Sequence, residues 1–283
     1  MTLPIKRIYI DSRFKSADSR SDSDFFVDLP QTLLMPERAG FYLDDISIPV
    51  SWYPIEAGRN NKLYIELFDL PHNIILYPHI SETKVVEIPE QNYTTVDLGS
   101  MIQTKINEAF TDEEFTVTVT HDPATQRYTI LGTEGREWKL LTDAEIAKKG
   151  GYSTPYCSMN YVLSNFFPQT NMNQAPDNIV PFVSGYINVY PIRNIYIVAS
   201  GIGDFNTMSL SGERAIVKKV PVTAGYGEMI FNDAVVGMDY LDCSRQTLSR
   251  LGFRLTNLYG ETIDLHGHHW SFSLVFSKIQ EIT

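Results

Sequence analysis

The sequence predicts an all-β fold, a sandwich or jelly roll, with a small α+β block inserted in it. Three features point to this fold class: alternating apolar patterns at both ends, many short strand-like segments after residue 186, and one helical segment near residue 100. The sixteen Tyr and fifteen Phe suit the half-buried surfaces of sheets, and they also suit large protein interfaces.

The final strand pattern is the clearest in the chain. One face carries Trp270, Phe272, Leu274 and Phe276, and the other carries Ser271, Ser273, Val275 and Ser277. Because side chains alternate across a strand, the apolar set is expected to be buried. The amino terminus shows the same alternation around Tyr9 and again over 25–29, so both ends belong to a sheet.

Between these ends the pattern changes twice. Strands are expected at 41–48, at 63–68 and in two short pieces of 72–88 split near Pro78, and the polar tract Ser16–Asp24 is expected to be a mobile loop. Apolar side chains then recur at helical spacing over Val96–Phe110, with Thr94 or Thr95 as the N-cap.

An α+β block follows this helix. A hairpin is expected around the turn His121–Gln126, then a strand at 138–141 and a short helix at 143–148. Gly150–Asp177 has no period and is interpreted as a long irregular connection or binding loop. Strands resume after it, and they are expected near 187–189, 195–197, 216–222, 228–231, 251–255 and 270–276. No crossover helices separate them, which excludes a parallel sheet.

Charge and cysteine content exclude several functions. The formal net charge of −11 argues against a surface that coats nucleic acid, because such binding needs Lys and Arg. Cys157 and Cys243 are too few for a four-cysteine zinc site or a disulfide framework and indicate a reducing compartment. No apolar run approaches the length of a membrane-spanning helix, and the amino terminus lacks the apolar core of a signal peptide, so secretion is not expected.

The residues that could bind a metal or act in catalysis form only weak motifs. His266, His268 and His269 could bind zinc, but no Cys lies nearby and Asp264 is the one adjacent carboxylate, so a polar turn is the simpler interpretation. The acidic pairs at 44–45 and 239–242 suit solvated strand ends, and 201–203 and 209–213 lack the setting of a dinucleotide loop or a nucleophile elbow. We expect no catalytic, cofactor-binding or metal-binding residues.

Several short motifs carry a family resemblance. They are Ile8–Arg13, Ser23–Pro30, Leu43–Trp52, Asn60–Tyr64, Pro191–Tyr196, Gly212–Arg214, Ile216–Pro221, Asp239–Ser244 and Leu265–Ser273. Together they resemble the minor capsid, or penton, proteins of Polinton (Maverick) elements and their adintovirus and virophage relatives.

The resemblance implies a single jelly roll that forms homopentamers at the fivefold vertices of an icosahedral double-stranded DNA virus or Polinton capsid. The partner would be a major capsid protein with two jelly rolls, and the location would be the virion, after synthesis in the host cytoplasm or nucleus. On this basis residues 1–85 and 151–283 are expected to form the jelly roll, and residues 86–150 an inserted α+β domain.

Basic residues near the amino terminus are the candidate assembly contacts. They are Lys6, Arg7, Arg13 and Arg20. With Lys15, Arg193, Arg214, Lys218 and Lys219 they concentrate positive charge in an acidic chain, so salt bridges within an assembly, or weak contacts with packaged DNA, are expected. Met1–Arg7 and Ser16–Ser23 are expected to reach neighbouring subunits or the capsid interior.

Two other function classes stay open. A receptor- or carbohydrate-binding β-sandwich would use exposed aromatic residues near Trp52, Tyr53 and Tyr152–Tyr161. A hydrolase on a β scaffold would use the three histidines.

Overall fold

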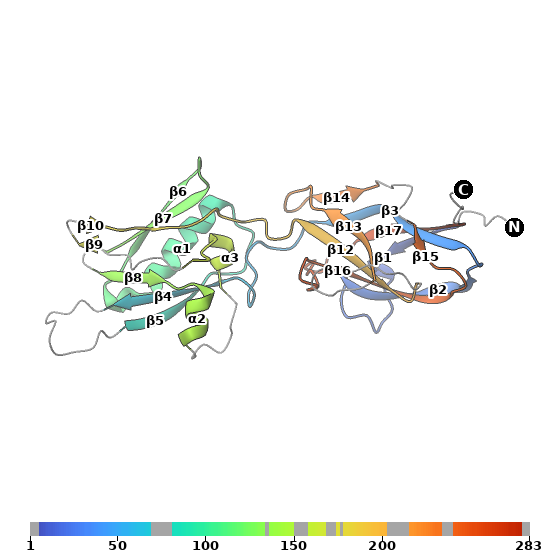
Figure 1. Cartoon of the computed structure of the whole chain (residues 1–283), viewed down its shortest axis with the longest axis horizontal. Helices are drawn as coiled ribbons and strands as arrows, with labels where there is room; N and C mark the ends of the chain where they lie inside the picture. The colour runs from blue at the N-terminus through green and yellow to red at the C-terminus, as the bar shows by residue number, and fades with distance from the viewer. Residues whose placement is uncertain are drawn as a thin grey trace. The chain divides into compact units, whose positions relative to one another are not determined.

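The chain divides into two compact units. The computed structural model describes residues 6–68, 81–133, 136–149, 158–167, 174–175, 178–202, 215–233 and 240–278. Unit 1 comprises Met1–Trp52 and Ile192–Thr283, and unit 2 comprises Tyr53–Pro191. Figure 1 shows the elements of both units along the chain.

Unit 1 contains two antiparallel sheets. The first has the order β1 (Lys6–Asp11), β17 (Ser271–Lys278), β3 (Ala39–Pro49), β14 (Met229–Asn232), and β15 (Leu241–Asp242) pairs with the same edge of β3 as β14. The second has the order β13 (Ile216–Pro221), β12 (Asn194–Ser200), β16 (Thr247–Thr256), β2 (Asp24–Leu34). If β14 and β15 count as one interrupted strand, each sheet has four strands and the order is that of a jelly roll.

The alternating sequence pattern explains the core of this sandwich. Trp270, Phe272, Leu274 and Phe276 are at most 2% exposed, as the pattern predicts. Phe253 of the second sheet lies 4.7 Å from Phe272 of the first, between ring centroids, and Phe25 lies 5.6 Å from Trp270. Edge-on aromatic contacts of this kind hold the two sheets together beyond the free energy of area burial.

The opposite face of β17 is also buried at its centre, although its serines suggest an exposed face. Ser273 and Val275 are also buried, although they point away from the core. The reason is that β17 lies between β1 and β3, with Val275 directly between Arg7 and Tyr42. A central strand can therefore bury both faces.

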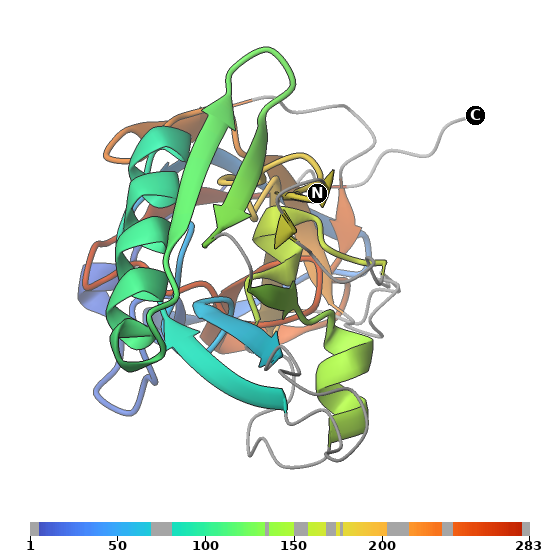
Figure 2. The same cartoon turned by 90° about the vertical axis from the view of Figure 1, so that its left-hand side faces the viewer.

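Unit 2 is the α+β part of the chain. Its helices are α1 (Thr95–Ala109), α2 (Asp143–Lys149) and α3 (Asn160–Leu163); its strands are β4 (Lys62–Phe68), β5 (Ser81–Glu87), β6 (Val117–Asp122), β7 (Arg127–Gly132), β8 (Glu137–Leu140), β9 (Gln174–Ala175), β10 (Asn178–Ile179) and β11 (Phe182–Val183). They form the sheets β5-β4-β8, β11-β7-β6 and β10-β9. Figure 2 shows α1 running beside the hairpin of β6 and β7.

Side-chain hydrogen bonds cap the amino end of α1 and connect the helix to β6. The predicted helix is confirmed, and the Thr94 hydroxyl caps its amino end by accepting from the backbone N–H of Asp97 at 3.2 Å. Asn107 accepts from the backbone N–H of Val117 at 2.7 Å, and Gln103 accepts from that of Val119 at 2.9 Å. The side-chain amides of these two residues thereby connect α1 to β6.

The domain boundaries differ from those expected. The structure separates the units at 52–53 and 191–192, not at 85–86 and 150–151. Strands β4 and β5, assigned to the jelly roll by sequence, pair with each other and with β8 in unit 2. An alternating strand pattern shows that a strand has a buried face but does not show which core buries it.

Three local expectations need comment. The segment near Ile187 is not a strand, although Ile187 is buried in the core of unit 2. Residues 72–80, Cys157 and the motif 209–213 lie outside the described residues. None of the described helices is long and apolar enough to cross a bilayer.

Candidate assembly interface

Arg7 forms ion pairs within its own subunit. Its guanidinium donates to Asp44 at 2.8 Å and to Asp45 at 2.5 Å, both on the neighbouring part of the first sheet. Asp45 has a φ of 50° where the register of β17 and β3 shifts, and this bulge turns its carboxylate toward Arg7. Arg7 thus makes ion pairs within its own subunit, and its contact with a neighbouring subunit stays a prediction.

Arg13 and Arg20 also form ion pairs within their own subunit. Arg13 donates to the Asp11 carboxylate at 2.6 Å, and Arg20 lies 3.3 Å from that of Asp24. The hydrogen bond from Arg13 holds the pKa of Asp11 below its ordinary value. Lys6, the fourth predicted contact, begins β1 at the edge of the first sheet and is half-buried. The structure does not bring these four residues together as one basic patch.

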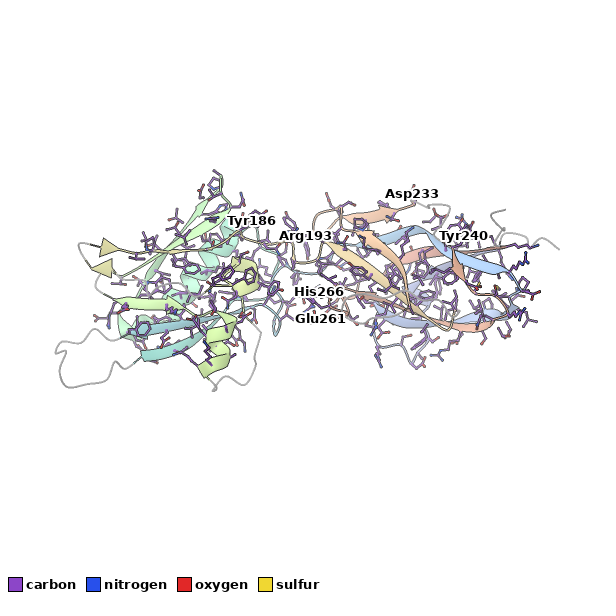
Figure 3. All side chains as sticks on the ribbon, in the orientation of Figure 1. Tyr186, Arg193, Asp233, Tyr240, Glu261 and His266 are labelled. Carbon is purple, nitrogen blue, oxygen red and sulfur yellow. The ribbon has the colours of Figure 1, made fainter. Side chains whose placement is uncertain are left out.

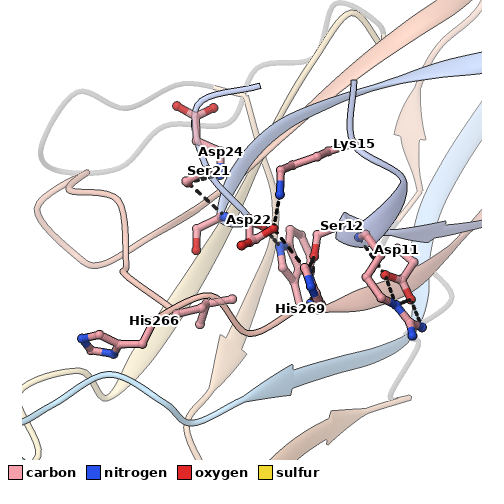
Figure 4. A network of polar contacts seen from close by, with 12 residues as sticks. Asp11, Ser12, Lys15, Ser21, Asp22, Asp24, His266 and His269 are labelled. Carbon is pink, nitrogen blue, oxygen red and sulfur yellow. Dashed lines mark hydrogen bonds and ion pairs between the residues drawn. The ribbon is translucent and has the colours of Figure 1, made fainter. Parts of the chain in front are cut away.

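The polar tract after β1 is anchored by hydrogen bonds, in contrast to the mobile loop that we expected. Lys15 pairs with Asp22, and the Ser16 backbone N–H donates to the Phe26 carbonyl at 2.7 Å. The indole N–H of Trp270 donates to the Asp22 carbonyl at 2.9 Å. Figure 4 shows the contacts of Asp22 with Lys15 and His269.

The histidines do not converge on a metal site. The His269 Nδ1 atom lies 3.2 Å from the Ser12 hydroxyl and 3.2 Å from the Asp22 carboxylate. The His266 Nδ1 atom lies 2.7 Å from the Ser51 carbonyl, in a different direction (Figure 4). In the part of the chain that the structure describes, no three His, Cys, Asp or Glu side chains gather as metal ligands. The hydrolase alternative thus has no assembled histidine site.

The second sheet has a charged outer face that sequence reasoning missed. Arg250 pairs with Asp18 at 2.5 Å and lies 4.6 Å from the ring centroid of Phe26. Gly252 makes room for this ring, because a Cβ atom there would lie 2.7 Å from the Phe26 Cε1 atom. The signal in the sequence is the alternation of charged residues on two strands, 24–28 and 250–254, that pair with each other.

Large apolar side chains are exposed on unit 1. Tyr9 is 78% exposed, Phe14 80%, Leu34 76% and Phe231 73%. Exposed aromatic side chains are typical anchors of protein interfaces. They lie on or next to sheet edges, where no core pattern marks them in the sequence.

Cys243 belongs to the core and not to a reactive site. Its side chain is 1% exposed, and burial raises the pKa of its thiol to about 12. The thiol therefore stays protonated at neutral pH and is a poor nucleophile.

Comparison with known proteins supports the fold. The structure is similar to the crystal structure of the mavirus penton protein, with a TM-score of 0.53 and 12% sequence identity over 98% of this chain and 100% of that one. No family model matches the sequence. No curated protein matches it either. The similarity covers both units, and the chain therefore has the fold of a penton protein, as the sequence motifs led us to expect.

Proposed function

We propose that the protein is a penton protein that forms homopentamers at the fivefold vertices of an icosahedral double-stranded DNA virus or Polinton capsid. The observation that carries this proposal is the structural similarity to the mavirus penton protein across nearly the whole of both chains. The complete two-sheet jelly roll of unit 1 supports it. The role is structural, the location is the virion, and the partners are further copies of this chain and a double jelly-roll major capsid protein.

The inserted unit fits this role. Unit 2 lies between β3 and β12, so the jelly roll keeps every strand and both sheets while carrying a second domain in one loop. Domain insertion is tolerated at loops, where it leaves the host core unchanged. We accordingly propose that Tyr53–Pro191 is the inserted domain.

A mass measurement tests the proposal first. Light scattering of the purified chain is expected to give five times the monomer mass, and co-expression with the major capsid protein is expected to place the chain in particles. A chain that stays monomeric at high concentration, both alone and with the major capsid protein, and that never enters particles would contradict the vertex assignment.

A truncation tests whether the amino-terminal residues contribute to incorporation into particles. Removal of all seven first residues would delete Lys6 and Arg7, and with them the start of β1 and the ion pairs to Asp44 and Asp45. Removal of residues 1–5 leaves β1 whole. We expect this shorter truncation to reduce incorporation into particles while the unfolding temperature of unit 1 stays unchanged.

A second candidate function, receptor or carbohydrate binding, has one observation in its favour. Tyr161 and Phe167 from 158–167 and Tyr186 from 182–190 are 56%, 81% and 56% exposed, and the two segments contain no charged residue. A hydrogen bond of 2.7 Å from the Ser164 hydroxyl to the Tyr186 carbonyl joins them (Figure 3 labels Tyr186). Aromatic side chains with few charges suit a neutral partner. Of the aromatic residues predicted from sequence, Trp52 is buried and cannot contribute.

A glycan array tests this second candidate. The intact protein is expected to bind neutral oligosaccharides, and Tyr161→Ala with Phe167→Ala is expected to abolish binding. Phe14→Ala, an equally exposed aromatic residue of unit 1, is the matched control. Equal binding by all variants, or none by the intact protein, would contradict it.

A further inference from the structure

The outer face of the first sheet has aromatic edges, with a row of small side chains between them. One row across it joins Asp11, Ser271, Ser47 and Phe231, on β1, β17, β3 and β14. Tyr9 stands at one edge and Phe231 at the other, 78% and 73% exposed, with serines between them. Such a surface can receive side chains of another protein between two aromatic anchors.

This face is acidic. The strands of this sheet carry one outward guanidinium, that of Arg7, and four outward carboxylates. The carboxylates belong to Asp11, Asp44, Asp45 and Asp242. Arg7 pairs with two of them and Arg13 pairs with Asp11, so two guanidinium groups face four carboxylates and the net charge of this face is negative.

The outer face of the second sheet has the opposite balance. Its strands direct three cations outward, Lys219, Arg250 and Arg254, against the carboxylates of Asp24 and Asp28. Two loop residues add one charge of each sign, because Asp18 pairs with Arg250 and Arg20 with Asp24, so cations outnumber carboxylates by four to three. The guanidinium of Arg250 lies over the Phe26 ring, which holds this planar cation in place on the outer face. The two faces of one sandwich are thus complementary in charge.

Resting on the proposed pentamer, we propose that the outer face of the first sheet in one copy binds the outer face of the second sheet in the next copy. A ring requires such a heterologous interface, in which one flank fits the opposite flank of a neighbour. Opposite charge attracts unlike faces, whereas two first-sheet faces repel each other, which disfavours a closed dimer. Tyr9 and Phe231 are the apolar anchors.

Two variants, each altered on one face, test the proposal. Tyr9→Ala with Phe231→Ala removes the anchors of the first face, and Lys219→Glu with Ser200→Glu makes the second face acidic. All four side chains are exposed, so each variant is expected to keep the unfolding temperature of the unaltered chain. Each is expected to raise the concentration needed for half-maximal assembly at least about tenfold.

Mixing the two variants gives the sharper result. Each variant retains one intact face, so an equimolar mixture is expected to form a dimer of one copy of each and no larger ring. Leu258→Ala, an exposed apolar residue in the turn after β16 and on neither sheet face, is the control and is expected to assemble like the unaltered chain.

The outcomes separate this inference from the proposed function. If the unaltered chain is pentameric but either face variant assembles equally well, or the mixture stays monomeric, the inference is wrong and the pentamer stands. If the unaltered chain itself never associates, both are wrong.

Discussion

Single side chains in unit 1 show how directly an alternating pattern translates into a core. Phe272 is 2% exposed and contacts the rings of Phe253 and Trp270 at centroid distances of 4.7 and 4.9 Å. Phe272→Ala removes these contacts and leaves a cavity, so it should lower the free energy of unfolding by about 3 to 5 kcal/mol. Chemical denaturation measures the change. Phe14→Ala, 80% exposed, should have almost no effect, and an equal loss in both would contradict the proposed core.

Burial also determines thiol chemistry at residue 243. Because the pKa of the Cys243 thiol is raised to about 12, almost no thiolate exists at pH 8. Iodoacetamide at pH 8 should therefore leave Cys243 unmodified in the folded chain and modify it after addition of guanidinium. Mass spectrometry of the peptide that contains Cys243 distinguishes the two states. Rapid modification without denaturant would show that this part of the core opens readily.

At the scale of elements, the sequence predicted what local periodicity determines. The helix at 95–109, the hairpin of β6 and β7, and the strands β3, β12, β16 and β17 all lie close to the expected positions. The ion pairs of Arg7 and Arg250 were not predictable, because each joins residues far apart in sequence and depends on which segments lie side by side and in which register. The same limit explains why β4 was assigned to the wrong core.

One ion pair links two elements of unit 2 in a pH-dependent way. Lys84 on β5 pairs with Glu113 after α1, in the 3-10 helix Thr111–Glu113, and this hydrogen bond holds the pKa of Glu113 below its ordinary value of 4.5. A lowered pKa stabilises the fold above the unfolded-state pKa, and the stabilisation is lost as pH falls through the folded-state pKa. Stability should therefore fall below about pH 4.5.

Glu113→Gln isolates this contribution. At pH 7 the variant should be less stable by about 1 kcal/mol, and the difference should shrink as the pH is lowered below the ordinary pKa of glutamate. Thermal unfolding across the pH range measures it. Glu108→Gln, which removes an exposed partner of Lys105 on α1, is the control and should change little. A difference that stays constant with pH would show that Glu113 acts through packing and not through charge.

At the scale of the whole molecule, the two cores are separate. Every buried side chain of the main core of unit 1 comes from 10–52 or 192–276, and every one of the main core of unit 2 comes from 55–187. Among the residues that the structure describes, no buried side chain belongs to both cores. Since hydrophobic burial is the dominant stabilising term, each unit should fold on its own core.

Replacement of residues 53–191 by a short linker tests this independence. Stacked sheets lie about 10 Å apart, and a glycine-serine linker of about six residues can reach roughly 20 Å, enough to join Trp52 to Ile192 across the sandwich. The shortened chain should unfold cooperatively and keep the near-ultraviolet dichroism of Trp270, while losing the helical signal of α1. It should also still assemble if the sheet faces of unit 1 form the ring. Without cooperative unfolding, unit 2 would be part of the folding unit of the jelly roll and not an insertion in it.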